Sequence, residues 1–247
     1  RVLAAGIAFP DVLVVEGKHM MKREPPFVPA SELCGVVVEI GEDVDSVKVG
    51  DCVFGTSLTG SLAEFALMRD VDCHPVPAGV VPEVCAGFEI NYGTAWHGLK
   101  DLANISEGET VLILGASGGV GMAAIDISKA LGAEVIACAS TDAKLDKCKQ
   151  AGADQLINYS KGNFKSQLKE EGLYGNIDIV FDPVGGDLSE VCIRALGFGG
   201  RNTYGTNVTI HPVKGRVHQF PFIKPRSLIL PVHRPSKYDS EKNICVL

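Results

Sequence analysis

The amino-acid sequence predicts an α/β protein in which a doubly wound parallel sheet follows a smaller, mostly β unit. Residues 1 to about 105 hold short apolar runs broken by glycine and proline, which is typical of strands joined by turns. From residue 106 onward, strand and helix patterns alternate at short intervals, as in a parallel sheet with right-handed crossovers. A glycine cluster separates the first of these strands from its helix.

Short strands are expected in the first part of the chain. Gly35–Gly41 is predicted as a strand that ends in a turn, and Val47–Phe54 as two strands around a Gly-Asp turn. Ala63–Leu67 has the pattern of another short strand. Strands this short, with this punctuation, indicate a compact and mostly β unit.

The second part begins with Thr110–Leu114, a continuous apolar run of the kind found in a strand buried on both faces. Apolar residues then recur at helical spacing, at Val120, Ala123, Ala124, Ile127 and Leu131. The same alternation predicts strands at Glu134–Ala139, around Ile157 and at Ile177–Phe181, and helices at Asp142–Gln150, Phe164–Glu171 and Leu188–Leu196.

The alternation is lost from about Asn207. The tail is rich in proline, and only Ser227–Val232 has the pattern of a strand. We therefore divide the chain into a mostly β domain at 1–105, a parallel-sheet domain at 106–206 and a divergent, proline-rich tail at 207–247.

Composition and charge disfavour several classes of protein. The chain of 247 residues is 46% hydrophobic and 21% charged, which suits a globular protein with a buried core. Its net charge of -7 and the lack of a long Lys/Arg run disfavour nucleic acid as a partner. No apolar run reaches the roughly 20 residues of a membrane span.

The 8 cysteines are scattered and include no C-x-x-C pair. We therefore expect free thiols in a reducing, cytoplasmic compartment. A mitochondrial location stays open, because no initiator Met opens the chain and a targeting segment could have been removed.

The segment Leu114–Met122 joins the first buried strand to its helix, and it predicts a dinucleotide site. Its glycines follow a G-x-x-G-x-x-G spacing with one extra glycine. A helix N-terminus offers N–H donors and a positive dipole end to a pyrophosphate, and glycines let the phosphates approach. We assign six residues to the cofactor: Gly115, Ser117, Gly118, Gly119, Val120 and Gly121. The alternative is a tight turn without a ligand.

The end of the second predicted strand favours NADPH over NADH. Enzymes that use NADH usually place Asp or Glu there to hold the ribose 2′-OH, and this strand ends without one. Ser140 and Lys144 supply a hydroxyl and a cation for a 2′-phosphate, with Tyr159 as a candidate stacking partner. Asp142, only two residues beyond Ser140, is a counter-argument, and Lys144 could be an ordinary exposed helix lysine.

Several segments together resemble the zinc-free quinone oxidoreductase branch of the medium-chain dehydrogenase/reductase superfamily. Besides the glycine segment they are Ala4–Asp11, Pro29–Val37, Val49–Asp51, Asn91–His97, Ser140–Lys144, Gly152–Asp154 and Asp182–Gly186. The resemblance implies a GroES-like catalytic domain followed by a Rossmann NADPH-binding domain. It further implies transfer of a hydride from NADPH to quinones or other α,β-unsaturated carbonyls, in a cleft between the domains.

The resemblance also implies roles for individual residues. Asn91, Tyr92 and Thr94 correspond to the segment that approaches the nicotinamide, and are the candidate catalytic residues. Ser140, Lys144 and Tyr159 match positions around the 2′-phosphate.

No metal is expected. Ser31 stands where zinc-dependent relatives carry a ligand histidine, Phe9 and Pro10 fill the region of the ligand cysteine, and the four-cysteine lobe is absent. A quinone is already electrophilic, so hydrogen-bond donors suffice to stabilise the oxyanion that forms.

Two departures from the family pattern leave an alternative open. Ala8-Phe9 replaces an Asn-Tyr pair, and Phe9 cannot donate a proton; Tyr92 could substitute, or it could be a half-buried core aromatic. The GroES-like domain is expected to be truncated at its start, and the Rossmann sheet incomplete after Thr206, where relatives carry the edge that forms a homodimer. The alternative is a truncated, catalytically impaired isoform that binds nucleotide in a regulatory or scaffolding role.

Overall fold

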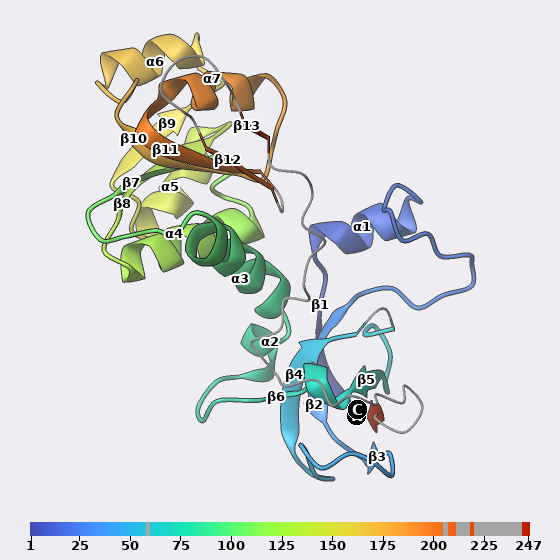
Figure 1. The fold of residues 1–247 in the computed structure, drawn as a ribbon. Helices are drawn as coiled ribbons and strands as arrows, with labels where there is room; N and C mark the ends of the chain where they lie inside the picture. The colour runs from blue at the N-terminus through green and yellow to red at the C-terminus, as the bar shows by residue number, and fades with distance from the viewer. Residues whose placement is uncertain (58–59, 205–206, 211–217, 220–243) are drawn as a thin grey trace. The chain divides into compact units, whose positions relative to one another are not determined.

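The computed structural model describes residues 1–57, 60–204, 207–210, 218–219 and 244–247, and it divides the chain into two compact units (Figure 1). Unit 1 comprises Arg1–Asn91 with Ile229–Leu247, and unit 2 comprises Tyr92–Leu228. The domain limits at residues 105 and 206 stay predictions.

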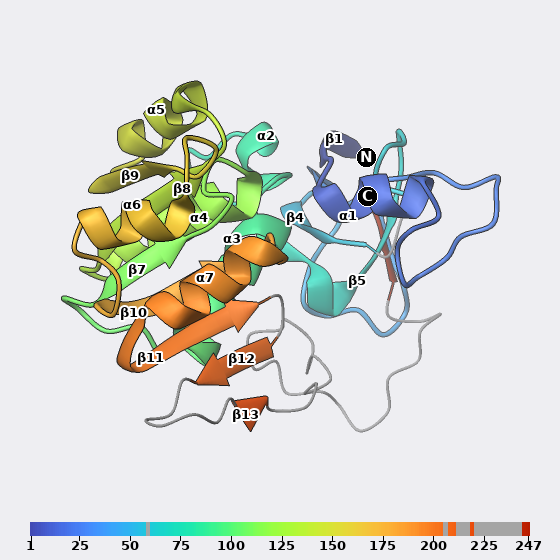
Figure 2. The same ribbon diagram turned by 90° about the horizontal axis from the view of Figure 1, so that it is seen from above.

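Unit 2 is built on a parallel sheet. Among the described residues its five parallel strands are β9 (Gln155–Asn158), β8 (Glu134–Ala139), β7 (Thr110–Ile113), β10 (Ile177–Asp182) and β11 (Leu196–Tyr204), in this spatial order. Counted along the chain, the order is 3-2-1-4-5, that of a Rossmann sheet. Two antiparallel strands, β12 (Asn207–Ile210) and β13 (His218–Gln219), extend the sheet beyond β11, as Figure 2 shows.

Helices cover both faces of this sheet. Successive side chains of a strand point to opposite faces, so Val111 and Ile113 of β7 pack in one core cluster, and Leu112 and the following Leu114 pack in the other. This double burial explains the continuous apolar run. The first cluster is shared with α3 (Glu89–Trp96), the π-helix η2 (His97–Leu102), α4 (Gly119–Ala130) and α5 (Asp142–Gln150), and the second with α6 (Phe164–Glu170) and α7 (Asp187–Ala195) (Figure 1).

Unit 1 is mostly β in the part of it that the structure describes. One antiparallel sheet has the order β1 (Val2–Gly6), β2 (Glu32–Val36), β4 (Cys52–Thr56) and β6 (His74–Pro75). A second has the order β3 (Glu39–Ile40), β14 (Ile244–Val246) and β5 (Leu67–Arg69). The helical segments of this unit are α1 (Phe9–Val15), the 3-10 turn η1 (Asp70–Asp72) and α2 (Pro82–Cys85).

These observations confirm the predicted fold class, an α/β protein with a parallel Rossmann sheet and a separate, mostly β unit before it. Two of the predicted elements, Glu134–Ala139 and Asp142–Gln150, have the observed bounds. No helix in the described part of the chain has both the length and the apolar character that a membrane span requires.

Some element predictions were wrong. Residues 47–50 and 63–66 are not strands, because turns and bends interrupt them before β4 and β5 begin. The fifth parallel strand β11 was missed, since its sequence is rich in glycine and polar residues. Arg201 secures β11 by donating to both oxygens of the Glu109 carboxylate, at 2.8 and 2.7 Å. The predicted strand Ser227–Val232 lies outside the described residues.

We predict that Gly98→Ala destabilises unit 2. A Cβ at this position in η2 would lie 2.5 Å from Cε2 of the buried Phe181, so the core would be overpacked. The free energy of unfolding should fall by about 1–3 kcal/mol, measured by urea denaturation. Gly87→Ala is the control, because nothing lies within 4 Å of a Cβ there. Equal effects of the two substitutions would contradict the prediction.

Candidate functional site

The carboxyl ends of β7, β8, β9 and β10 lie along one edge of the parallel sheet. In open α/β sheets ligands bind outside this edge, because the loops there are free to differ without disturbing the core. Most of the residues that the sequence assigns to a cofactor follow three of these strands, β7, β8 and β9.

The turn between β7 and α4 depends on two glycines. Gly115 has a φ of +58°, and a Cβ there would lie 2.8 Å from Cγ2 of Val184. A Cβ on Gly121 would lie 2.5 Å from the carbonyl oxygen of Gly115 and 2.7 Å from Cα of Ala116. The first turn of α4 therefore packs directly against the backbone of the loop, as the sequence predicts for Gly121.

The N-terminus of α4 is open to a ligand. Gly118 is the N-cap, and no side chain caps the helix. The Met122 N–H donates to the Gly118 oxygen at 2.8 Å, whereas the N–H groups of Gly119, Val120 and Gly121 come too early in the helix for such a bond. Gly118 and Gly119 are exposed and Ser117 is half-buried, so an anion can approach these donors.

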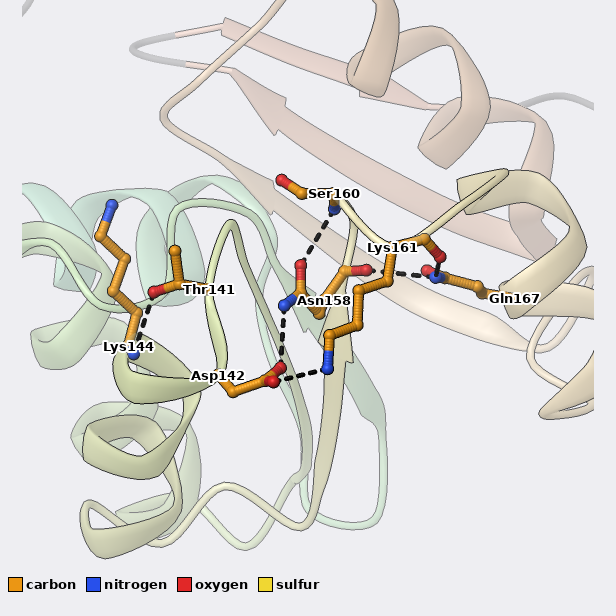
Figure 3. A network of polar contacts seen from close by, with 7 residues as sticks. All are labelled: Thr141, Asp142, Lys144, Asn158, Ser160, Lys161 and Gln167. Carbon is orange, nitrogen blue, oxygen red and sulfur yellow. Dashed lines mark hydrogen bonds and ion pairs between the residues drawn. The ribbon is translucent and has the colours of Figure 1, made fainter.

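The structure brings Ser140 and Lys144 together after β8. The Lys144 ammonium donates to the Ser140 hydroxyl at 3.1 Å. Thr141 caps α5, since its hydroxyl accepts the backbone N–H of Lys144 at 3.4 Å (Figure 3). A hydroxyl and a cation therefore lie side by side at the end of β8, which is the arrangement expected around a phosphate.

Tyr159 lies just beyond β9. Its ring is half-buried, packs against the second core cluster and meets Phe164 edge to face, with ring centroids 6.4 Å apart. Its N–H donates to the Ala139 oxygen at 3.2 Å, which holds it beside the end of β8. Tyr159 is therefore packed in part against the core and accessible in part to solvent.

The three candidate catalytic residues lie on α3. The Asn91 side chain donates to the Gly87 oxygen at 3.1 Å, and Thr94 is half-buried. The Tyr92 hydroxyl donates to the Asp126 carboxylate on α4, and this hydrogen bond raises the pKa of Tyr92 to about 12, with burial adding to the shift. Tyr92 therefore has to exchange this partner before it could donate to a substrate.

Asp182 is a residue of the site that the sequence-based assignment omitted. It is buried at the end of β10, and one of its oxygens accepts the N–H groups of Val184 and Gly185 at 2.9 and 2.8 Å. Its other oxygen accepts the Ser189 hydroxyl. Asp182 thus shapes the loop that brings Val184 onto Gly115. An Asp at the end of an apolar strand, followed by proline and two glycines, was the available signal.

In unit 1, Ser31 and the start of α1 meet at a hydrogen-bonded carboxylate. Asp11 is buried in α1 and accepts the Ser31 hydroxyl and the Ala8 N–H, each at 2.8 Å. Phe9 is exposed at the start of the same helix. Within the described residues, no group of three or more His, Cys, Asp and Glu side chains is arranged to hold a metal.

Two further acidic groups of unit 1 are affected by burial. Glu32 accepts the Ile90 N–H at 2.8 Å, at the start of α3, and burial raises the pKa of Glu32 to about 7. Burial also raises the pKa of Glu89 to about 7, helped by the charges of Asp72 and Glu32. These carboxyls therefore titrate near neutral pH.

Comparisons with known proteins agree with this arrangement. The family model for the alcohol dehydrogenase GroES-like domain matches residues 1–78, and the model described as zinc-binding dehydrogenase matches residues 119–239. Quinone oxidoreductase-like protein 2 of Bos taurus is 36% identical over 197 residues, which cover 79% of this chain and 56% of that protein. The chain therefore spans little more than half the length of this curated relative.

The chain is also similar to solved structures of quinone oxidoreductases. The quinone oxidoreductase of Thermus thermophilus, solved also as its complex with NADPH, matches with a TM-score of 0.70 and 32% identity, over 83% of this chain and 63% of that one. The quinone oxidoreductase of Escherichia coli, complexed with NADPH, matches with a TM-score of 0.75 and 29% identity, over 81% of this chain and 61% of that one.

We predict that the free energy of unfolding falls as the pH rises from 5 to 8. The folded state holds the Glu32 and Glu89 protons more tightly than the unfolded state does, where the pKa of a glutamate has its ordinary value of 4.5. Glu32→Gln keeps an acceptor for the Ile90 N–H but removes the carboxyl that titrates. The fall in the free energy of unfolding should then shrink by about 1.4 kcal/mol or more, since one pH unit of pKa difference is worth that amount. Urea denaturation at both pH values measures it.

The control is Glu83→Gln, at an exposed position of α2, which should leave the fall as it is in the unaltered chain. A Glu32→Gln protein with an undiminished fall would contradict the assignment of this pH dependence to the buried carboxyl.

Proposed function

The chain belongs to the quinone oxidoreductase family of the medium-chain dehydrogenase/reductase superfamily, and on that premise we propose that it uses NADPH to reduce quinones or other α,β-unsaturated carbonyls. The observation that carries the proposal is the open N-terminus of α4, next to the Ser140–Lys144 pair. NADPH, when bound, supplies the hydride.

The described residues fit this nucleotide. The uncapped N–H groups at Gly119, Val120 and Gly121 suit the pyrophosphate, and a side chain on Gly121 would push α4 away from the loop. Ser140 and Lys144 suit a 2′-phosphate, because together they offer a hydroxyl and a positive charge. The part of the Tyr159 ring outside the core suits stacking.

The proposed reaction needs no metal. A quinone or enone is electrophilic enough to accept a hydride, and the oxyanion that forms is stabilised by hydrogen-bond donors and then protonated. We assign this part of the reaction to the α3 segment of Asn91, Tyr92 and Thr94. In the proposal Tyr92 donates once its hydroxyl leaves Asp126, and the substrate is a small, largely apolar molecule.

A second candidate function is nucleotide binding without turnover, in a regulatory or scaffolding role. Two observations favour it: Phe9 has no group to donate, and the hydroxyl of Tyr92 is bound to Asp126. A chain without an available proton donor could still bind NADPH through the residues after β7 and β8.

We predict that Lys144→Glu weakens the binding of NADPH and not that of NADH. A carboxylate beside a phosphate adds repulsion where an attraction was present, so the dissociation constant for NADPH should rise at least about tenfold, with that for NADH little changed. Fluorescence titration with both nucleotides measures this. Lys147→Glu, farther along α5, makes the same charge change at an exposed position and should have a small effect. Equal affinity of the unaltered chain for the two nucleotides would refute the phosphate site.

Turnover separates the two candidate functions. A reductase should oxidise NADPH in the presence of some members of a panel of quinones and enones, as followed by the absorbance of NADPH. If Tyr92 donates the proton, Tyr92→Phe should lower kcat by about 100-fold or more while KM changes little. NADPH binding with no turnover on any member of the panel would support the second candidate instead.

A further inference from the structure

A carboxylate stands beside the proposed 2′-phosphate site. Asp142 is the first residue of α5, two positions after Ser140 and two before Lys144. Negative charge at a helix N-terminus is favourable for the helix, but an isolated carboxylate here would repel a dianionic phosphate. Contacts that offset the charge of Asp142 therefore affect the preference of the site for NADPH over NADH.

Both oxygens of Asp142 are engaged by side chains from the end of β9 and from the turn that follows it. Asn158 donates to Oδ1 at 2.8 Å, and the Lys161 ammonium lies 2.5 Å from Oδ2. These contacts lower the pKa of Asp142, with the hydrogen bond from Lys161 as the largest cause. Figure 3 shows Asp142 turned toward Asn158 and Lys161, whereas the Lys144 side chain extends in another direction.

Lys161 is held in place by the turn that carries it. The Lys161 N–H donates to the Asn158 oxygen at 3.1 Å, and the Ser160 N–H donates to the Asn158 side chain at 3.0 Å. The Gln167 amide donates to the backbone oxygens of both Asn158 and Lys161 (Figure 3). The turn is thus organised before any ligand arrives, and it presents the ammonium to Asp142.

The pair of Lys161 and Asp142 contributes little to the stability of the fold. The side chains of Lys161 and Asp142 are 64% and 63% exposed, and exposed ion pairs of this kind contribute little to folding. Their more direct effect is on the local field, since Lys161 offsets a negative charge within two residues of both Ser140 and Lys144.

We propose that Lys161 is a specificity-determining residue: by pairing with Asp142 it offsets the carboxylate that lies between Ser140 and Lys144 in the sequence, which lets that pair accept a 2′-phosphate. The inference rests on the proposed NADPH site and adds a residue from another loop to it. Lys161 acts through Asp142, and does not itself hold the phosphate.

A double-mutant cycle tests the inference, with NADPH and NADH titrated at low salt into four proteins: the unaltered chain, Lys161→Met, Asp142→Asn and the double variant. Lys161→Met exposes the charge of Asp142, so the dissociation constant for NADPH should rise about fivefold, with that for NADH unchanged. The double variant should bind NADPH as the unaltered chain does. The loss in Lys161→Met should shrink as salt is added.

Two controls accompany the cycle. Lys149→Met removes the same charge from the far end of α5 and should leave both affinities unchanged. Lys161→Arg keeps the pair and should preserve the NADPH affinity. Thermal unfolding of the Lys161 and Lys149 variants should match that of the unaltered chain, because both side chains are exposed.

Three results would overturn the inference. One is an equal loss of affinity for both nucleotides in Lys161→Met, which indicates a distorted turn. Another is an undiminished loss in the Asp142→Asn background, which indicates that Lys161 contacts the phosphate directly. The third is no loss at all. Failure of the NADPH site is recognised separately, since the unaltered chain would then show no preference for NADPH.

Discussion

The close contact between two stretches of backbone at Gly121 is the constraint on which the candidate site depends. The first turn of α4 lies so near the Gly115–Ala116 loop that no side chain fits between them. This contact fixes the direction in which α4 leaves β7, and with it the aim of the free N–H groups at its start. Val184 covers Gly115 from the neighbouring loop, which Asp182 holds in shape. Two glycines, a valine and a buried carboxylate are therefore linked by close contacts and hydrogen bonds.

The chemistry of several polar side chains depends on the partner that each one contacts. Asp142 alone would argue against a 2′-phosphate, yet Asn158 and Lys161 occupy both of its oxygens. Tyr92 alone would be a ready proton donor, yet Asp126 holds its hydroxyl. In unit 1, the Ser31 hydroxyl donates to the buried carboxylate of Asp11. Each case shows a polar group whose chemistry is set by the neighbour that satisfies it, because unpaired polar groups are costly to bury and charges act over short distances in water.

The cysteines show the same dependence on surroundings. All eight are free, and only Cys52 is not buried. Burial is the largest cause of the shift at Cys34, whose pKa rises to about 12, and it also raises the pKa of Cys138 and Cys192. Thiols of this kind are poor nucleophiles, because the reactive thiolate is scarce at neutral pH. These thiols therefore act as small apolar side chains in the cores of the two units.

The sequence by itself determined the central part of unit 2. Its strands are continuous apolar runs, its first helix repeats apolar residues at a spacing of 3.6, and its glycine spacing is typical of a phosphate-binding turn. These signals are local, so Glu134–Ala139 and Asp142–Gln150 were predicted with their observed bounds. Only the tertiary structure decided which distant segments pair. Strand β11 has a weak local pattern and is held by β10 and by the contact of Arg201 with Glu109, while β14 lies between β3 and β5. The partners of Asp142 and Tyr92 likewise come from other elements, and no local pattern encodes a contact between residues that only folding brings together.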